Sequence, residues 1–208
     1  VSSVVKAIED AELMAGTEVG TAYVGVTGQH IKGENSKGVV AVSNRQRTIT
    51  PVEIKRVIEA AQAVVIPVDR EIIHVLSKEF AVDDQTGIKD PIGMSGVRLE
   101  AEVHIITGST TTIQNLLKST NRAGYQCSDV IFAPLASAEA ALSRDEKELG
   151  VALVDIGGGT TDIVVFIEGG VAYSSVLSIG GIHVTNDISI GLRTPIESAE
   201  VIKKKHGC

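Results

Sequence analysis

The sequence predicts an α/β fold that carries an inserted α+β piece near residues 31–107. Segments with helical spacing of apolar residues alternate with short apolar strands along most of the 208 residues. Only 3% of the residues are aromatic and none is Trp, so we expect a core of Val, Ile, Leu and Ala. Such a core suits buried strands beneath helices.

The first elements are a helix and a strand that precede the insertion. Apolar residues at helical spacing predict a helix that Gly16 ends. Residues 21–27 alternate in polarity and predict a strand. Residues 28–38 are polar and rich in Gly, so a loop or subdomain boundary is expected there, followed by a short strand at 39–43.

The clearest local signal inside the insertion is a helix start. Thr50 at the N-cap, Pro51 at the first helical position and Glu53 three residues after the cap form a capping box. Beyond this helix, a strand is predicted at 71–76. Residues 83–96 are rich in Asp, Gly and Pro and predict a long loop.

A strictly alternating strand closes the insertion. Residues 97–105 place an apolar side chain at every second position, with Arg98, Glu100, Glu102 and His104 between them. This alternation predicts an antiparallel strand with one face toward water.

Helices and strands alternate again from residue 108 to the end. The predicted elements are a helix ending near Gly124, a strand at 128–133, a small-residue helix at 136–142, a charged turn at 143–148, strands at 151–155, 162–167 and 171–179, and a helix from about residue 182. The last helix is expected to begin with Thr194 as N-cap, Pro195 next and Glu197 three residues on.

Composition and charge exclude several classes of function. Lys and Arg number 19 against 26 Asp and Glu, and a net charge of −7 argues against non-specific nucleic-acid binding. No apolar run approaches the length of a membrane span. Cys127 and Cys208 lack metal-like spacing, which indicates a reduced cytosolic setting with Cys127 as a buried small residue. The histidines also lack such spacing and are expected to be structural: His30, His74, His104, His183 and His206.

The sharpest chemical signal is the segment Asp-Ile-Gly-Gly-Gly-Thr-Thr-Asp at 155–162, which lies between two predicted strands. It lacks the Gly-Lys-Ser/Thr of a Walker A loop, and a strand follows it where a dinucleotide fingerprint needs a helix. The amides of Gly157, Gly158 and Gly159 can converge on an anion with no side chain in the way. We therefore predict a phosphate-binding hairpin.

Neighbouring side chains add to this prediction. Thr160 and Thr161 supply hydroxyl donors, and Asp155 can hold Mg²⁺ through its water shell. The plainer alternative is a glycine hairpin with an Asp cap, although two turn residues suffice for a hairpin.

The same segment, with its flanking strands, resembles the second phosphate loop of the actin, hexokinase and chaperone ATPase superfamily. Residues 178–181, Ser-Ile-Gly-Gly before a helix, resemble that superfamily's entry into its second half. Residues 11–14, 87–99 and 194–208 point to one family within this superfamily. Together they resemble the FtsA family of bacterial actin-like cell-division proteins across essentially the whole chain. The resemblance implies an actin-like (ribonuclease-H-like) ATPase half-domain with an inserted subdomain.

The resemblance also divides the chain into three pieces. Residues 1–30 and 108–179 correspond to subdomain 1A without its N-terminal part, 31–107 to an inserted 1C-type (SHS2-like) subdomain, and 180–208 to the start of subdomain 2A. The chain is then a central fragment. The first phosphate loop would precede it, and the 2B-type subdomain and a C-terminal amphipathic membrane helix would follow it.

ATP and Mg²⁺ are the cofactors that the resemblance implies. The implied site consists of phosphate-binding Gly157, Gly158, Gly159, Thr160, Thr161, Gly180 and Gly181, nucleoside-binding Glu200 and Lys203, and Asp155 and Asp162 holding Mg²⁺ through water. Simpler alternatives are a plain turn for the glycine pair at 180–181 and solvated charges for Glu200 and Lys203.

One departure bears on catalysis. Chaperone relatives often carry Glu before the Pro that starts a helix, and here that position is Ala133. We therefore expect at most a slow ATPase in the full-length protein and no activity in this fragment, which is expected to bind ATP weakly or not at all.

In biological terms, the resemblance implies a filament-forming scaffold that anchors the FtsZ ring and recruits later divisome proteins. It would work at the cytoplasmic face of the inner membrane at the division site. The fragment itself is expected to be soluble, with membrane contact only through the C-terminal helix. Alternatives are a PilM-like pilus-assembly ATPase, or a sugar or acetate kinase of the same superfamily. A kinase needs a substrate-binding Asp or Arg cluster that residues 31–107 do not offer.

Overall fold

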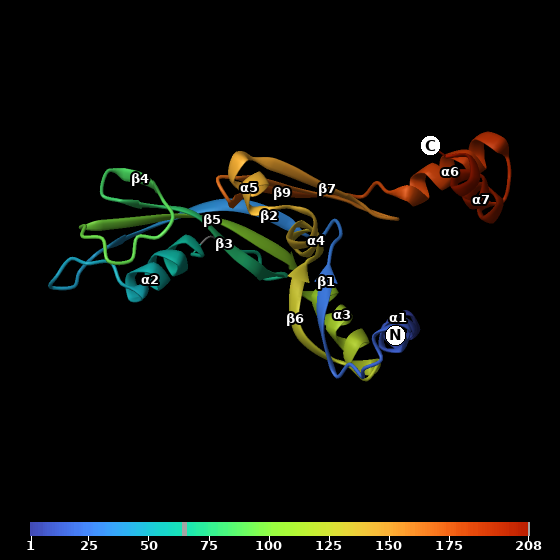
Figure 1. The fold of residues 1–208 in the computed structure, drawn as a ribbon, viewed down its shortest axis with the longest axis horizontal. Coiled ribbons are helices and arrows are strands. Elements are labelled where there is room, and N and C mark those ends of the chain that lie inside the picture. The colour runs from blue at the N-terminus through green and yellow to red at the C-terminus, as the bar shows by residue number, and fades with distance from the viewer. Residues whose placement is uncertain (64–65, 208) are drawn as a thin grey trace.

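The computed structural model describes residues 1–63 and 66–207 and contains three sheets with helices around them (Figure 1). Cys208 lies outside the described residues. The elements in chain order are α1 (Ser2–Ala15), β1 (Thr21–Val26), β2 (Lys32–Ala41), α2 (Pro51–Ala61), β3 (Arg70–Val82), β4 (Gln85–Ile88), β5 (Arg98–Ser109), α3 (Thr110–Arg122), β6 (Gln126–Phe132), α4 (Ala133–Ala141), α5 (Arg144–Leu149), β7 (Val151–Ile156), β8 (Thr161–Ile167), β9 (Gly170–Leu177), α6 (Gly181–Leu192) and α7 (Ile196–His206).

The inserted piece is an antiparallel sheet in the order β2-β5-β3-β4, with α2 packed on one face. The predicted capping box starts α2, because the Thr50 hydroxyl accepts a hydrogen bond from the Val52 amide and the Glu53 carboxylate accepts one from the Thr50 amide at 3.1 Å. Between helix and sheet lies one buried apolar cluster: Val42, Ile49, Val57, Ala61, Phe80, Val82, Leu99, Ala101, Val103 and Ile105.

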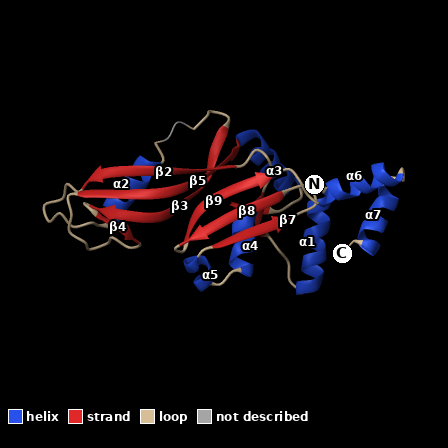
Figure 2. Ribbon diagram, turned by 90° about the horizontal axis from the view of Figure 1, so that it is seen from above, coloured by secondary structure: helices blue, strands red, loops and turns tan. Residues whose placement is uncertain are grey.

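The second core joins the other two sheets to the inserted piece. Strands β1 and β6 pair in parallel, and β7, β8 and β9 form an antiparallel sheet whose strand β9 also contacts β2, β3 and β5 (Figure 2). One buried cluster contains residues from all three sheets and α4: Val26, Ile31, Ile106, Phe132, Ala138, Val164, Phe166 and Val171. The β7–β9 sheet is therefore held by its inner face.

Strand β2 corrects the sequence expectation of a loop at 28–38. Residues from Lys32 onward form a strand, and ten consecutive residues pair with β5 in register. This stretch lacks the alternating apolar residues that identify a half-buried strand. Most of its side chains are polar and point to solvent. Its pairing is determined by β5, a partner distant in sequence.

Other element boundaries also differ from expectation. Strand β3 continues to Val82 and turns into β4, so the stretch predicted as one loop at 83–96 contains a short strand. The charged turn predicted at 143–148 is instead the helix α5, with its own capping box between Ser143 and Glu146. Thr194 does not cap α7, whose N-cap is Pro195.

Two single residues are placed differently from their predicted surroundings. His104 does not face water: it is 1% exposed because β9 covers this part of β5. Cys127 is half-buried rather than fully buried. Both departures depend on how the sheets pack, which the alternation within one strand does not encode.

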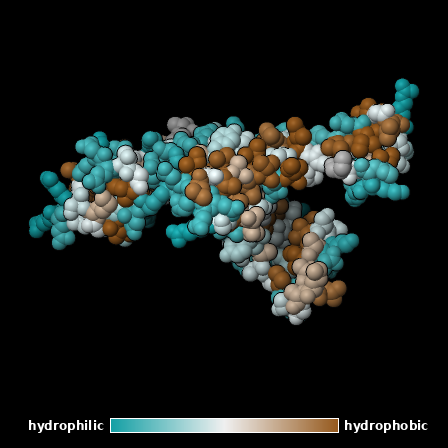
Figure 3. Space-filling view, turned by 45° about the horizontal axis from the view of Figure 1, so that its top comes forward, coloured by the Kyte–Doolittle hydropathy of each residue, from teal (hydrophilic) through white to brown (hydrophobic). Residues whose placement is uncertain are grey.

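The outer face of the β7–β9 sheet remains apolar and exposed, and apolar side chains also gather on α6 and α7 (Figure 3). Val154, Ile156, Tyr173 and Leu177 supply the sheet part of this surface. Apolar patches of this kind are typical of surfaces that contact other protein. Among the described residues, no helix combines the length and apolar character needed to cross a membrane.

Gly38 provides a test of how closely α2 packs on β2. A Cβ at Gly38 would lie 2.2 Å from the Val57 carbonyl oxygen and 2.5 Å from the Ala61 nitrogen, both backbone atoms of α2. We expect Gly38→Ala to lower the free energy of unfolding by about 1–3 kcal/mol, because helix and strand must separate. Urea unfolding measures this. Gly20→Ala is the matched control, because a Cβ there meets nothing within 4 Å; equal losses in the two variants would contradict the packing argument.

Candidate functional site

The candidate site lies at the tip of the β7–β8 hairpin, where residues 157–160 connect the two strands. The Gly157 amide donates to the Thr160 carbonyl at 2.8 Å, which closes the loop. The first amides of α6 donate to this loop: Gly181 to the Gly157 carbonyl at 3.0 Å and Ile182 to the Gly158 carbonyl at 2.8 Å. The loop and the start of α6 thus form one hydrogen-bonded unit.

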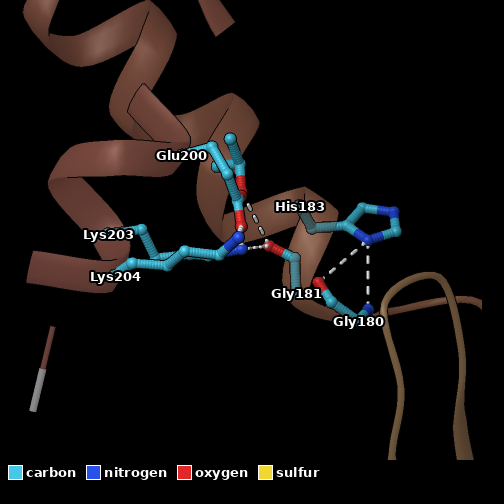
Figure 4. A network of polar contacts seen from close by, with 7 residues as sticks. Gly180, Gly181, His183, Glu200, Lys203 and Lys204 are labelled. Atoms are coloured by element: carbon cyan, nitrogen blue, oxygen red, sulfur yellow. Dashed lines mark hydrogen bonds and ion pairs between the residues drawn. The ribbon is translucent and has the colours of Figure 1, made fainter. Parts of the chain in front are cut away.

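Gly180 permits this close approach. A Cβ there would lie 2.6 Å from the Gly157 carbonyl oxygen and 2.7 Å from the Gly158 carbonyl oxygen, and both are backbone atoms. Its own amide donates to Nδ1 of His183 at 3.1 Å (Figure 4). The glycine pair is therefore more than a plain turn, because its first member lets a helix pack directly on the loop.

Docking of α6 also determines where the remaining loop amides point. In a planar trans peptide, the C=O and the following N–H point in opposite directions. Because the carbonyls of Gly157 and Gly158 face α6, the amides of Gly158 and Gly159 point away from it. Across the part of the chain that the structure describes, these two amides and that of Thr160 have no backbone or side-chain acceptor. Three successive free amides are suited to binding an anion.

Two carboxylates lie side by side just below the loop. Asp155 and Asp162 are directly paired across β7 and β8, on the inner face of the sheet. Both oxygens of Asp162 accept threonine hydroxyls, one from Thr27 and one from Thr160 at 3.3 Å. Asp155 accepts one hydroxyl, that of Ser137, at 2.7 Å.

These hydrogen bonds distinguish the two candidate metal ligands, Asp155 and Asp162. Asp162 is 4% exposed and fully engaged, whereas Asp155 is half-buried and keeps Oδ1 without a donor among the described residues. Within the same residues, no three His, Cys, Asp or Glu side chains cluster at metal-binding distance. A metal held directly by several protein ligands is therefore not supported here, whereas Mg²⁺ held through water needs few carboxylates.

A polar cluster links α6 to α7 next to the loop (Figure 4). Lys203 Nζ lies 2.7 Å from the Glu200 carboxylate, 2.8 Å from the Thr185 hydroxyl and 3.1 Å from the Gly181 carbonyl. The Thr185 hydroxyl donates to the Glu200 carboxylate at 2.6 Å, and Lys204 Nζ lies 3.4 Å from the same carboxylate. The hydrogen bonds from Lys203 and Thr185 lower the pKa of Glu200 to about 2.

Two family models match the chain. The model described as "SHS2 domain inserted in FTSA" matches residues 28–107, and the model described as "Cell division protein FtsA" matches residues 152–208. The FtsA cell division protein of Pseudomonas aeruginosa is 49% identical over 208 residues, and that of Neisseria meningitidis is 44% identical over 207. The chain belongs to the FtsA family. It spans about half the length of these relatives, 49% and 50%, while all of it is matched.

Among solved structures, the fold resembles the PilM-PilN type IV pilus biogenesis complex, with a TM-score of 0.66 and 17% identity over 99% of this chain and 56% of that one. This likeness concerns the fold alone. Together with the FtsA family models, it confirms the predicted fold class, an actin-like α/β fold with an inserted subdomain.

In this FtsA-family chain, the residues predicted for the site come together from three places. The glycine loop, the glycine pair and the Glu200–Lys203 pair are linked through Gly181, whose amide contacts the loop and whose carbonyl contacts Lys203. The amides of Gly157, Gly180 and Gly181 already have protein acceptors, and Thr161 donates its hydroxyl to the Ile179 carbonyl. These four residues build the loop's support in this structure.

Sequence reasoning missed four residues that complete the site: Thr27, Ser137, His183 and Thr185. Thr27 and Ser137 are far from the loop in sequence, and only packing brings them to the aspartates. Thr185 and His183 carried a weak signal, because they stand on the first turns of a helix that follows two glycines. His183 is the third residue of α6, and its Nδ1 accepts from the amide of the N-cap residue Gly180, as Glu or Gln does in a capping box.

The depressed pKa of Glu200 gives a pH prediction. Its folded pKa of about 2 lies below the ordinary value of about 4.3, so its ion pair stabilises the α6–α7 contact above pH ~4 and is lost as the pH falls through about 2. Carboxyl ¹³C NMR should give a midpoint near 2 for Glu200. Lys203→Met should raise this midpoint toward the ordinary value, and Lys204→Met should raise it less. A midpoint near 4 in the unmodified chain would contradict the cluster.

Proposed function

We propose that this chain supplies part of the nucleotide site of an FtsA-type actin-like scaffold ATPase that acts in cell division. The observation that carries the proposal is the row of three free amides at Gly158, Gly159 and Thr160, of which the first two are turned away from α6. A phosphate group satisfies such donors, and membership of the FtsA family supports ATP as the ligand.

Within this proposal, the phosphate-binding set divides into two kinds of residue. Gly158, Gly159 and Thr160 contact phosphate directly, while Gly157, Thr161, Gly180 and Gly181 hold the loop in shape. Asp155 holds Mg²⁺ through water with its free oxygen, and Asp162 positions Thr160. When bound, Mg²⁺ would offset phosphate charge at this tip, where the first amides of α6 are already used by the loop carbonyls.

A nucleoside role for Glu200 and Lys203 remains a prediction. Both side chains are used by Thr185, by Gly181 and by each other. A ligand would therefore have to contact the outer edge of this pair or replace some of its hydrogen bonds. Hydrolysis is proposed to be slow at most, because Ala133 offers no group to position water.

The division of the chain is also a proposal. Residues 1–30 and 108–179 would be subdomain 1A, 31–107 the inserted 1C-type subdomain, and 180–208 the start of 2A. The FtsA model matches 152–208 without a break, so it joins the β7–β9 sheet and α6–α7 in one stretch. That continuity favours an earlier start for 2A than residue 180.

The proposed partners are those of the family. The full-length protein would polymerise, anchor the FtsZ ring at the cytoplasmic face of the inner membrane and recruit later divisome proteins through the inserted subdomain. A cleft of about 720 Å³ lies where β3 of that subdomain meets β6, α4 and β9, and it offers a protein-docking surface. The PilM-like alternative is supported by fold alone, whereas the FtsA relatives are 40–49% identical.

The test is Mg-ATP binding by a full-length protein that contains this chain, measured by isothermal titration calorimetry. Asp155→Ala should weaken binding about 10- to 100-fold, because a charge-assisted contact is worth about 1.5–3 kcal/mol. In EDTA the difference between variant and unmodified protein should largely disappear. The isolated 208-residue chain should bind weakly or not at all, because half of a cradle does not offset the ligand's lost freedom.

Asp145→Ala is the matched control, because Asp145 is an exposed carboxylate on α5. It should bind Mg-ATP like the unmodified protein. If Asp155→Ala melts far below the control, the carboxylate is structural and the metal role fails. Absence of saturable ATP binding in the full-length protein would overturn the proposed function.

A further inference from the structure

A polar relay whose centre is buried connects the inserted subdomain to the β8–β9 hairpin. Its members are Ser174 on β9, His104 on β5 and Asn35 on β2. The Ser174 hydroxyl lies 2.8 Å from Nε2 of His104, and Nδ1 of His104 lies 2.6 Å from Oδ1 of Asn35. Nδ2 of Asn35 donates to the Ala172 carbonyl at 3.0 Å, so the relay begins and ends on β9.

These contacts determine the direction of each hydrogen bond. The Asn35 side chain donates to Ala172 through its nitrogen, and its oxygen can only accept, so Nδ1 of His104 must carry a proton. Nε2 of His104 then accepts from the Ser174 hydroxyl. Burial, with a smaller contribution from Lys78, lowers the pKa of His104 to about 4, which keeps the ring neutral at pH 7.

The order serine, histidine, amide is also that of a hydrolytic triad, but this relay has no room for a substrate. His104 is 1% exposed and Ser174 is 4% exposed. A Cβ at Gly33 on β2 would lie 2.1 Å from the Ser174 oxygen and 2.6 Å from Nε2 of His104, so β2 closes over both groups. The relay therefore holds strands together.

Two further contacts fasten the same hairpin at its ends. Lys89, in the inserted subdomain, donates to the Glu168 carbonyl in the β8–β9 turn. At the other end, Thr27 donates to Asp162, the second residue of β8. In the register of the hairpin, Asp162 is opposite Val176, and Ser174 is opposite Val164. The relay thus lies two residues along the strand from the residues that support the glycine loop.

We propose that the Ser174–His104–Asn35 relay transmits occupancy of the 157–160 loop to strands β2 and β5 of the inserted subdomain. A shift of β8 on phosphate binding moves β9, its neighbour in the sheet. Because Ser174 and His104 are buried and hydrogen-bonded to each other, β9 must either move with β5 or leave these two groups unpaired, and Asn35 links the same pair to β2. This inference rests on the proposed function, since it takes a nucleotide as the loop's ligand.

The test is hydrogen–deuterium exchange of the full-length protein with and without Mg-ATP. Binding should slow exchange at the loop and at residues 34–37 and 103–106 of β2 and β5. In Ser174→Ala, the Kd for Mg-ATP should stay within about twofold of the unmodified value, while the response of β2 and β5 is lost. Asn35→Ala breaks the relay at its other end and should give the same loss.

Ser175→Ala is the matched control, because Ser175 lies next to Ser174 on β9 but on the opposite face of the sheet. It should keep the full response. A response that persists in Ser174→Ala and Asn35→Ala, or that is absent from the unmodified protein although Mg-ATP binds, overturns the relay. Failure of Mg-ATP to bind at all overturns the proposed function and the transmission with it.

A spectroscopic measurement checks the relay without nucleotide. Side-chain ¹⁵N NMR of His104 at pH 7 should show a protonated Nδ1 and an unprotonated Nε2. In Ser174→Ala, the Nε2 resonance should shift because its donor is gone, while Nδ1 should stay protonated because its contact with Asn35 remains. The retained protonated Nδ1 shows that the variant is folded. A protonated Nε2 in the unmodified protein would contradict the hydrogen-bond order and overturn the inference.

Discussion

The site depends on burial of the inner face of the β7–β9 sheet. Val164 and Phe166 of β8 are packed with Phe132 of β6 and Ile106 of β5, so one core contains all three sheets. Full burial of an apolar side chain stabilises by roughly 1.5–3 kcal/mol, which makes this face the main fastening of the hairpin. The same packing carries Asp155 and Asp162 on the inner side to the hydroxyls of Ser137 and Thr27.

The polar groups around this core are mostly paired with each other by hydrogen bonds. Asp162 has both oxygens engaged, His104 has both ring nitrogens engaged, and the start of α6 donates to the loop carbonyls. Buried polar groups are costly when unpaired, so the packing selects the arrangement that satisfies them. The three free amides at 158–160 differ because they are near the exposed tip, where water or a ligand can satisfy them.

Much of the fold could be predicted from the sequence because the signals are local. Helical spacing predicted α1 and α3, and the capping box predicted the start of α2. The limit of local signals is seen in two copies of one pattern, Thr-Pro-x-Glu at Thr50 and at Thr194. The first caps a helix. At the second, the Thr194 amide donates to the Ser189 carbonyl and closes α6, so α7 begins one residue later without that cap.

The glycine loop was also predictable from a local signal, but its orientation was not. Successive glycines between two strands indicate an anion-binding backbone, whatever surrounds them. Which amides remain free depends on α6, because its first N–H groups take the carbonyls of Gly157 and Gly158 and turn the next amides outward. Gly180 makes that contact possible, since any side chain there would meet the loop backbone. The helix therefore serves the site by orienting the loop rather than by offering its own N-terminus.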